Sequence, residues 1–100
     1  MVSTIHAEGT VMWLDGEHDA GSLHDLTETI AKAISVGDAD LVVDLSGATY
    51  ISMATIGELL RAQTFLRDHS RELKLRSPSP SAMSLLDACG LIGAVESDTG

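Results

Sequence analysis

A short apolar run near the middle of the chain, with an amphipathic segment on each side, constrains the fold most. Residues 41–43 are Leu-Val-Val, and within 40–45 this run predicts a strand that is covered on both faces. Apolar side chains repeat at steps of three and four over residues 22–34 and again over residues 56–68, which predicts two helices. A strand between two helices favours an α/β fold whose sheet is parallel in its interior.

The remaining segments predict further strands and one more helix. Two short strands are separated only by Glu8-Gly9, so we expect them to pair as an antiparallel hairpin. Pro80 is typical of a helix start, and Gly90 of a helix end. The further predicted elements are strands at 2–6 and 10–14, a half-exposed strand at 73–76, a helix from Pro80 to Cys89 and a short extended piece near Val95.

These elements predict one α/β domain over residues 1–100. We expect a mixed, mostly parallel sheet of four to five strands, with a strand of the N-terminal hairpin at its edge and about three to four helices. A chain of 100 residues with 44% hydrophobic residues has enough apolar surface for one core and too little for a second.

The charge of the chain is acidic and unevenly distributed. There are 15 acids against 6 bases, giving a formal net charge of −9, and residues 1–60 hold one base, Lys32. An acidic surface repels nucleic acid and anionic lipid, so we expect no nucleic-acid partner and no membrane insertion. The other five bases lie in residues 61–76 together with two acids, and we interpret that segment as a solvated helix end.

Cysteine usage and the N-terminal residues predict a cytoplasmic protein. The single cysteine, Cys89, excludes a disulfide within the chain, and we interpret it as a small buried hydrophobe of the third helix. No segment has the basic start and apolar centre of a signal peptide or the length of a membrane span.

The titratable residues form no pattern that is typical of catalysis. Four carboxylates near strand ends could form a ligand site, but we favour surface carboxylates that keep the strand ends soluble, since no base or nucleophile accompanies them. The four histidines lack zinc-ligand spacing, and we expect them on the surface. We therefore expect no metal, no cofactor and no enzymatic activity. The two sets are Asp15, Glu17, Asp19 and Asp44, and His6, His18, His24 and His69.

Three segments resemble one known family in sequence order. Residues 14–19 (LDGEHD) are similar to its Gly-Glu-Leu-Asp turn between the second strand and the first helix, with His18 in place of leucine. Residues 42–51 (VVDLSGATYI) match without a gap its pattern of two hydrophobic residues, Asp, Leu, Ser, Gly, a small residue, any residue, an aromatic and a hydrophobic residue. Residues 73–91 resemble its last strand, proline-marked loop and short helix that ends in Gly-Leu. The chain thus resembles the STAS family, the sulphate transporter and anti-sigma factor antagonist domain, in its stand-alone bacterial form.

The resemblance places a regulatory phosphate acceptor at a residue that cannot carry phosphate. The family segment Asp-Ser-Ser-Gly-Leu-Gly falls on residues 52–57 (SMATIG), and Ala54 stands where the second serine, the acceptor, is expected. Ser52 and Thr55 are candidate substitute acceptors, although we expect their hydroxyls to cap the helix start. Met53 beside Ala54 is compatible with a protein contact and equally with core packing.

The resemblance implies a protein-interaction regulator that binds an anti-sigma factor, of the ATP-binding serine kinase type in some systems, and thereby releases a sigma factor. The alternatives are an adaptor subunit of another assembly, such as a transporter ATPase complex or a stress scaffold, and a nucleotide-binding or small hydrolytic protein that uses the acidic strand ends. We expect a monomer or a weak homodimer. The expected partner-binding residues are Asp19, Ser52, Met53, Ala54, Thr55, Glu58 and Arg61.

Overall fold

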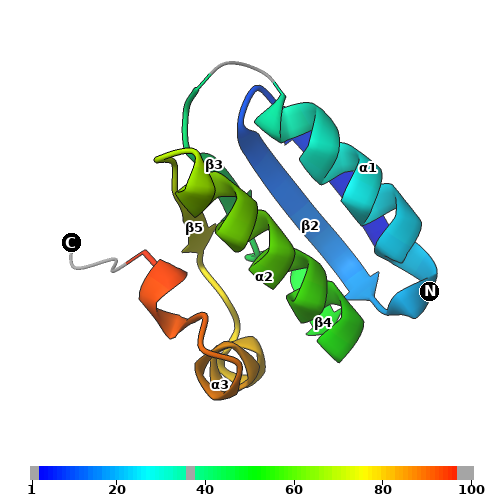
Figure 1. The fold of residues 1–100 in the computed structure, drawn as a ribbon. Coiled ribbons are helices and arrows are strands. Elements are labelled where there is room, and N and C mark those ends of the chain that lie inside the picture. The colour runs from blue at the N-terminus through cyan, green and yellow to red at the C-terminus, as the bar shows by residue number, and fades with distance from the viewer. Residues whose placement is uncertain (1–2, 36–37, 97–100) are drawn as a thin grey trace.

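The computed structural model describes residues 3–35 and 38–96 and forms the predicted single α/β domain, with a mixed sheet of five strands (Figure 1). Four strands have the order β1-β2-β3-β5, and β4 pairs with β2. In chain order the elements are β1 (Ser3–Glu8), β2 (Val11–His18), the 3-10 turn η1 (Ala20–Ser22), α1 (Leu23–Ile34), β3 (Leu41–Asp44), β4 (Ala48–Ile51), α2 (Met53–Asp68), β5 (Leu73–Arg76), α3 (Pro80–Ala88) and the 3-10 turn η2 (Ile92–Ala94).

The N-terminal hairpin forms one edge of the sheet, as predicted. β1 and β2 pair antiparallel, with Ile5 opposite Leu14 and Glu8 opposite Val11. Gly9 joins them at a φ of +63°, a conformation that glycine adopts at little cost. The interior pairs, β2 with β3 and β3 with β5, are parallel because a helix lies between the two strands of each pair along the chain.

The length of β2 and the existence of β4 differ from the prediction. Residues 14–19 were expected to form a turn, but β2 continues to His18 and its second half pairs in parallel with β4. The pairing shifts register between Gly16 and Glu17, and Gly16 has a φ of +83°. A short strand with an irregular register has no period-two pattern of its own, which explains why β4 was not predicted.

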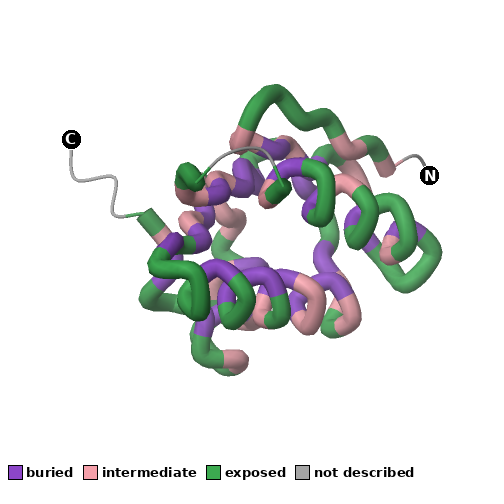
Figure 2. The backbone as a smooth tube through the Cα atoms, turned by 45° about the horizontal axis from the view of Figure 1, so that its top comes forward, coloured by how far each residue is buried: buried purple, intermediate pink, exposed green. Residues whose placement is uncertain are grey.

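The apolar core lies between the sheet and the two long helices. α1 and α2 run side by side on one face of the sheet, and the buried stretches of the chain turn toward the space between these layers (Figures 1 and 2). In β3, Leu41 and Val43 are buried in this core, whereas Val42 points to the other face and is only half-buried. The prediction that this strand is covered on both faces is therefore wrong, because both long helices pack against the same face.

Asp44 is a structural residue rather than one of the expected surface carboxylates. It lies at the end of β3, where its Oδ1 accepts a hydrogen bond from the backbone N–H of Ser46 at 2.8 Å. Its Oδ2 accepts from Nε of Arg76 in β5 at 2.9 Å. Burial by itself would raise the pKa of the Asp44 carboxyl, but the hydrogen bonds from Ser46 and the guanidinium of Arg76 outweigh burial and hold the pKa below its ordinary value.

The lowered pKa of Asp44 predicts a contribution to stability that acid removes. Because the pKa is lower in the folded state than in the unfolded state, the stabilisation is fully present above the unfolded pKa of about 4 and is lost as the pH falls through the folded pKa. We expect the wild type to be more stable than Asp44→Asn at neutral pH, and the difference to shrink below a pH of about 4. Urea unfolding over a pH series measures this difference. An equal difference at neutral and acid pH would contradict the prediction, and Asp87→Asn, at an exposed carboxylate of α3, is the control.

The basic segment after residue 60 is not solvated throughout, because Arg71 is only 7% exposed. Its Nε donates to the carbonyl of Ala39 at 2.8 Å, and its Nη1 donates to the carbonyl of Ile34, the last residue of α1, at 2.9 Å. Arg61 and Arg67, in contrast, are exposed as expected. Arg71 thus ties the end of α1 and the loop before β3 to the start of β5.

The C-terminal part of the domain returns to β5. Val95 forms a single parallel bridge with Leu75, and the N–H of Glu96 donates to the carbonyl of Leu75 at 2.8 Å, which confirms a short extended piece there. Cys89 at the end of α3 is half-buried and packs against the core. Within residues 3–35 and 38–96, every helix is too short or too polar to cross a bilayer.

Candidate functional site

The start of α2 is a well-defined helix N-terminus. Ser52 has an extended backbone, and its Oγ accepts a hydrogen bond from the backbone N–H of Thr55 at 3.2 Å, so it is the N-cap. The N–H of Ser52 itself donates to the carbonyl of His18 at 2.8 Å. This bond joins the end of β2 to the start of α2 and brings Asp19, the next residue after His18, close to the helix start.

Thr55 fixes this junction from inside the domain. It is fully buried, and its Oγ1 donates to the carbonyl of His18 at 3.0 Å while lying 3.1 Å from Oγ of Ser52. A hydroxyl with 0% exposure is inaccessible to a kinase and to a docked protein. Thr55 therefore presents no accessible hydroxyl in this structure, and its side chain positions the helix start. The prediction that Ser52 caps the helix is confirmed.

His18 lies buried beneath the site, so the expectation of a surface histidine is wrong for this residue. Its ring is 0% exposed, with Nε2 3.0 Å from the carbonyl of Asp15 and Nδ1 3.2 Å from Oγ of Ser22. Because a carbonyl only accepts, Nε2 carries a hydrogen and donates. Both ring nitrogens have partners, so a polar ring is tolerated in the interior. The resemblance places leucine at this position. A leucine side chain would leave the carbonyl of Asp15 and the hydroxyl of Ser22 without the hydrogen-bond partner that the His18 ring supplies.

The outer surface at the helix start is apolar and accessible. Met53 in the first turn of α2 is 60% exposed, which decides the open alternative in favour of a surface position over core packing. Ala54 beside it is half-buried, and Tyr50 at the end of β4 is 53% exposed. Sequence reasoning did not include Tyr50 in the site, although an aromatic residue just before a helix N-cap was a signal for it. We call Tyr50, Met53, Ala54 and Asp19 the α2-start surface.

Glu58 and Arg61 lie one to two turns further along α2. Oε1 of Glu58 accepts from Nη1 of Arg61 at 2.9 Å, where the Arg61 side chain is 81% exposed and that of Glu58 13%. An ion pair with one solvated partner contributes little to stability. Arg61 is thus solvated beyond the α2-start surface, whereas the side chain of Glu58 is largely buried.

Thr55→Val tests the structural role of the buried hydroxyl. The substitution keeps the shape of the side chain and removes its bond to the carbonyl of His18, which still accepts from Ser52. We expect the free energy of unfolding to fall by about 1 kcal/mol, the usual net value of one neutral hydrogen bond. Urea denaturation measures the change, and Thr64→Val, at an exposed threonine of the same helix, should change it by less than about 0.5 kcal/mol. Equal effects at the two positions would argue against the assigned role.

Ala54, at the centre of the α2-start surface, has no side-chain hydroxyl. A phosphate at a helix N-terminus is favoured by the free N–H groups and the helix dipole, but it requires a hydroxyl, and Ala54 has none.

Asp15 lies near this end of the sheet, where its carboxylate sits over Gly47 and a Cβ on that glycine would collide with it. Among the residues that the structure describes, no group of three histidine, cysteine or acidic side chains is placed to hold a metal ion.

Comparisons with known proteins support one family over almost the whole chain. The family described as "Mlab, STAS domain" matches residues 1–96. Among curated proteins, none matches the sequence significantly.

Solved structures of anti-sigma factor antagonists have the same fold. The unphosphorylated form of the anti-sigma factor antagonist SpoIIAA matches with a TM-score of 0.81 at 17% sequence identity, over 98% of this chain and 89% of the other. The phosphorylated form of SpoIIAA, a Bacillus cell fate determinant, matches with a TM-score of 0.73 at 16% identity, over 98% and 92% of the two chains. A proposed anti-sigma factor antagonist from Thermotoga maritima matches with a TM-score of 0.76 at 14% identity, over 97% and 88%. With the family match, the three segments of resemblance and this fold, the chain belongs to the STAS domain family.

Proposed function

We propose that this protein is a regulator of the anti-sigma factor antagonist type, which acts by binding an anti-sigma factor through the α2-start surface. The observation that carries the proposal is the 60% exposed Met53 beside Ala54 in the first turn of α2. A methionine adapts its shape to a partner, and it is frequent at binding surfaces. The likeness of the fold to SpoIIAA supports the same class of function.

The composition of the surface fits a protein interface. Tyr50 and Met53 would supply the apolar contacts at its centre, since aromatic residues and methionine are enriched in interfaces. Asp19 and Arg61 would form a polar rim, with Arg61 held by its ion pair to the largely buried Glu58. With a net charge of −9, the protein would attract a partner whose contact surface is basic, and the association rate would fall as salt is added.

The proposed binding is not controlled by phosphate at the centre of this surface. Ala54 has no hydroxyl, Thr55 is buried, and the hydroxyl of Ser52 caps the helix. We propose that binding is constitutive and is set by the amounts of the two proteins. The same feature supports the second candidate function, an adaptor subunit that stays bound in a stable assembly such as a transporter ATPase complex.

Capture from a lysate of the source cells tests both candidates. The tagged protein is used as bait with and without ATP, next to Met53→Asp and to Ile92→Asp, an equally apolar exposed site in η2. Recovery of an anti-sigma factor by the wild type and by Ile92→Asp, but not by Met53→Asp, would support the proposal, and recovery that ATP does not change would support constitutive binding. A stoichiometric complex with a transporter subunit would favour the adaptor instead. Equal recovery by all three baits would exclude the α2-start surface.

A further inference from the structure

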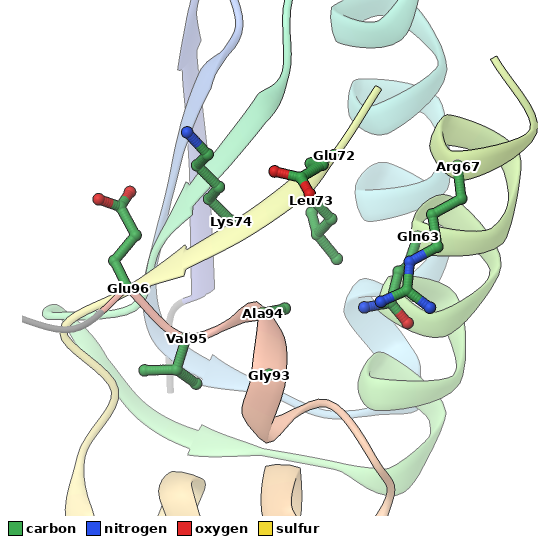
Figure 3. A pocket seen from close by; sticks show the side chains of 9 residues that line it. All are labelled: Gln63, Arg67, Glu72, Leu73, Lys74, Gly93, Ala94, Val95 and Glu96. Atoms are coloured by element: carbon green, nitrogen blue, oxygen red, sulfur yellow. The ribbon is translucent and has the colours of Figure 1, made fainter. Parts of the chain in front are cut away.

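One face of the sheet is turned away from α1 and α2 (Figure 1). Its side chains alternate along each strand with core residues, so that the half-buried Trp13 lies between the buried Met12 and Leu14. Figure 3 shows the same alternation in β5, where Leu73 points toward α2 and Lys74 leaves the strand on the other side. Parallel strands such as β2, β3 and β5 are usually covered on both faces of a sheet. This face therefore lacks a covering that parallel strands normally have.

The strand registers align the side chains of this face in two rows across the sheet. In each row, neighbours are direct partners in the strand pairing, so both rows run straight from β1 to β5. The first row is Glu8, Val11, Val42 and Lys74, and the second is His6, Trp13, Asp44 and Arg76. We call these two rows the open sheet face.

The first row is complementary to itself when its order is reversed. Glu8 at the β1 end is exposed, Val11 and Val42 in the middle are half-buried, and Lys74 stands at the β5 end. A two-fold axis parallel to the strands places a second copy against this face with its strand order reversed. Glu8 of one copy then faces Lys74 of the other, and valine faces valine. Lys74 also lies 3.5 Å from Oδ2 of Asp40 in its own chain, but an ammonium has three donors and can bind a second carboxylate.

The second row adds aromatic surface and a charge pair that is already neutralised. The half-buried ring of Trp13 has its centroid 5.4 Å from that of His6. Arg76 is paired with Asp44 at 2.9 Å within its own chain. The reversed copy thus brings an ion pair over the two rings instead of a single unpaired charge.

We propose that the open sheet face binds the same face of a second copy of this chain. The product is a two-fold dimer of two stacked sheets about 10 Å apart. Eight residues are fewer than the roughly 20–30 per side of a standard interface, and each copy has a net charge of −9, so the dimer is weak, with a Kd on the order of 100 µM. Because the face lies on the opposite side of the sheet from α2, the dimer does not depend on the proposed function.

Sedimentation velocity of the full chain tests for the dimer, over concentrations from about 5 to 500 µM. We expect the fraction of dimer to rise through this range. Trp13 is the only tryptophan of the chain, so its fluorescence should move to shorter wavelengths in step with the dimer as the ring loses contact with water. A monomer throughout the range, or a dimer that leaves the emission of Trp13 unchanged, would overturn the proposal.

Exchange of the two end charges tests the orientation of the copies. Glu8→Lys and Lys74→Glu should each weaken the dimer at least about tenfold, because like charges then face each other, and the double variant should restore the wild-type Kd within about threefold. Lys32→Glu, at an exposed position of α1, changes the net charge as Lys74→Glu does and should leave the dimer unchanged. Thermal unfolding checks that every variant is folded. A double variant as weak as the single ones, or a loss in Lys32→Glu equal to that in Lys74→Glu, would contradict the reversed arrangement.

Discussion

Replacing Ala54 by glutamate is expected to weaken binding of the captured partner by roughly 100-fold. Ala54 is half-buried between the exposed Met53 and the buried Thr55, so a docked partner would cover it. A carboxylate at the apolar centre of a desolvated interface, away from the polar rim where a basic partner would place its cations, is left unpaired, which costs about 3 kcal/mol or more. The fold itself should not suffer, because an acid in the first turn of a helix interacts favourably with the helix dipole. Isothermal titration of the purified pair measures the loss.

Two further variants separate charge from structure. Ala31→Glu places the same charge on an exposed position of α1 and should leave the affinity unchanged. Ala54→Ser should bind like the wild type and should become a substrate if the partner is a serine kinase, so that added ATP weakens only this variant. Binding of Ala54→Glu at wild-type affinity would show that the partner docks elsewhere. ATP-dependent release of the wild type, with phosphate mapped to Ser52, would contradict constitutive binding.

The elements that sequence predicted well are those with a local signal. α1, α2 and α3 have helical periodicity, α2 and α3 begin at serine caps, and the hairpin has a glycine turn, so each is specified by its own residues. β4 was missed because it is four residues long and is defined by pairing with the second half of β2, more than 30 residues away in the chain. The coverage of β3 was misjudged for a similar reason, since no local pattern says on which face a distant helix packs.

In the candidate site, too, the features with a local signal were predicted and those that depend on distant residues were not. The start of α2 and its Ser52 cap followed from the residues and from the family resemblance. The burial of Thr55 did not, because it depends on the carbonyl of His18, 37 residues earlier in the chain. Composition alone also does not distinguish a buried histidine from a surface one, because burial of His18 is tolerated only when its two ring nitrogens find partners in Asp15 and Ser22.

Arg71→Met is expected to lower the free energy of unfolding by about 3 kcal/mol, the largest loss among the stability predictions. Methionine fills much of the same volume but leaves the carbonyls of Ala39 and Ile34 without their charged donor, and hydrogen bonds to charged groups contribute about 1.5–3 kcal/mol each. The positive charge at the C-terminal end of α1 is lost as well.

Urea and thermal unfolding of Arg71→Met measure this loss, with a fall in Tm of about 12–24 °C expected for a domain of this size. Arg67→Met, four residues earlier and exposed, is the matched control and should change the free energy of unfolding by no more than about 0.5 kcal/mol. Arg71→Lys should fall between the two, because an ammonium keeps the charge but lacks the planar fork that reaches both carbonyls at once. A loss below about 1 kcal/mol for Arg71→Met would mean that water replaces the guanidinium at both carbonyls, and the junction of α1, β3 and β5 would then depend on apolar packing alone.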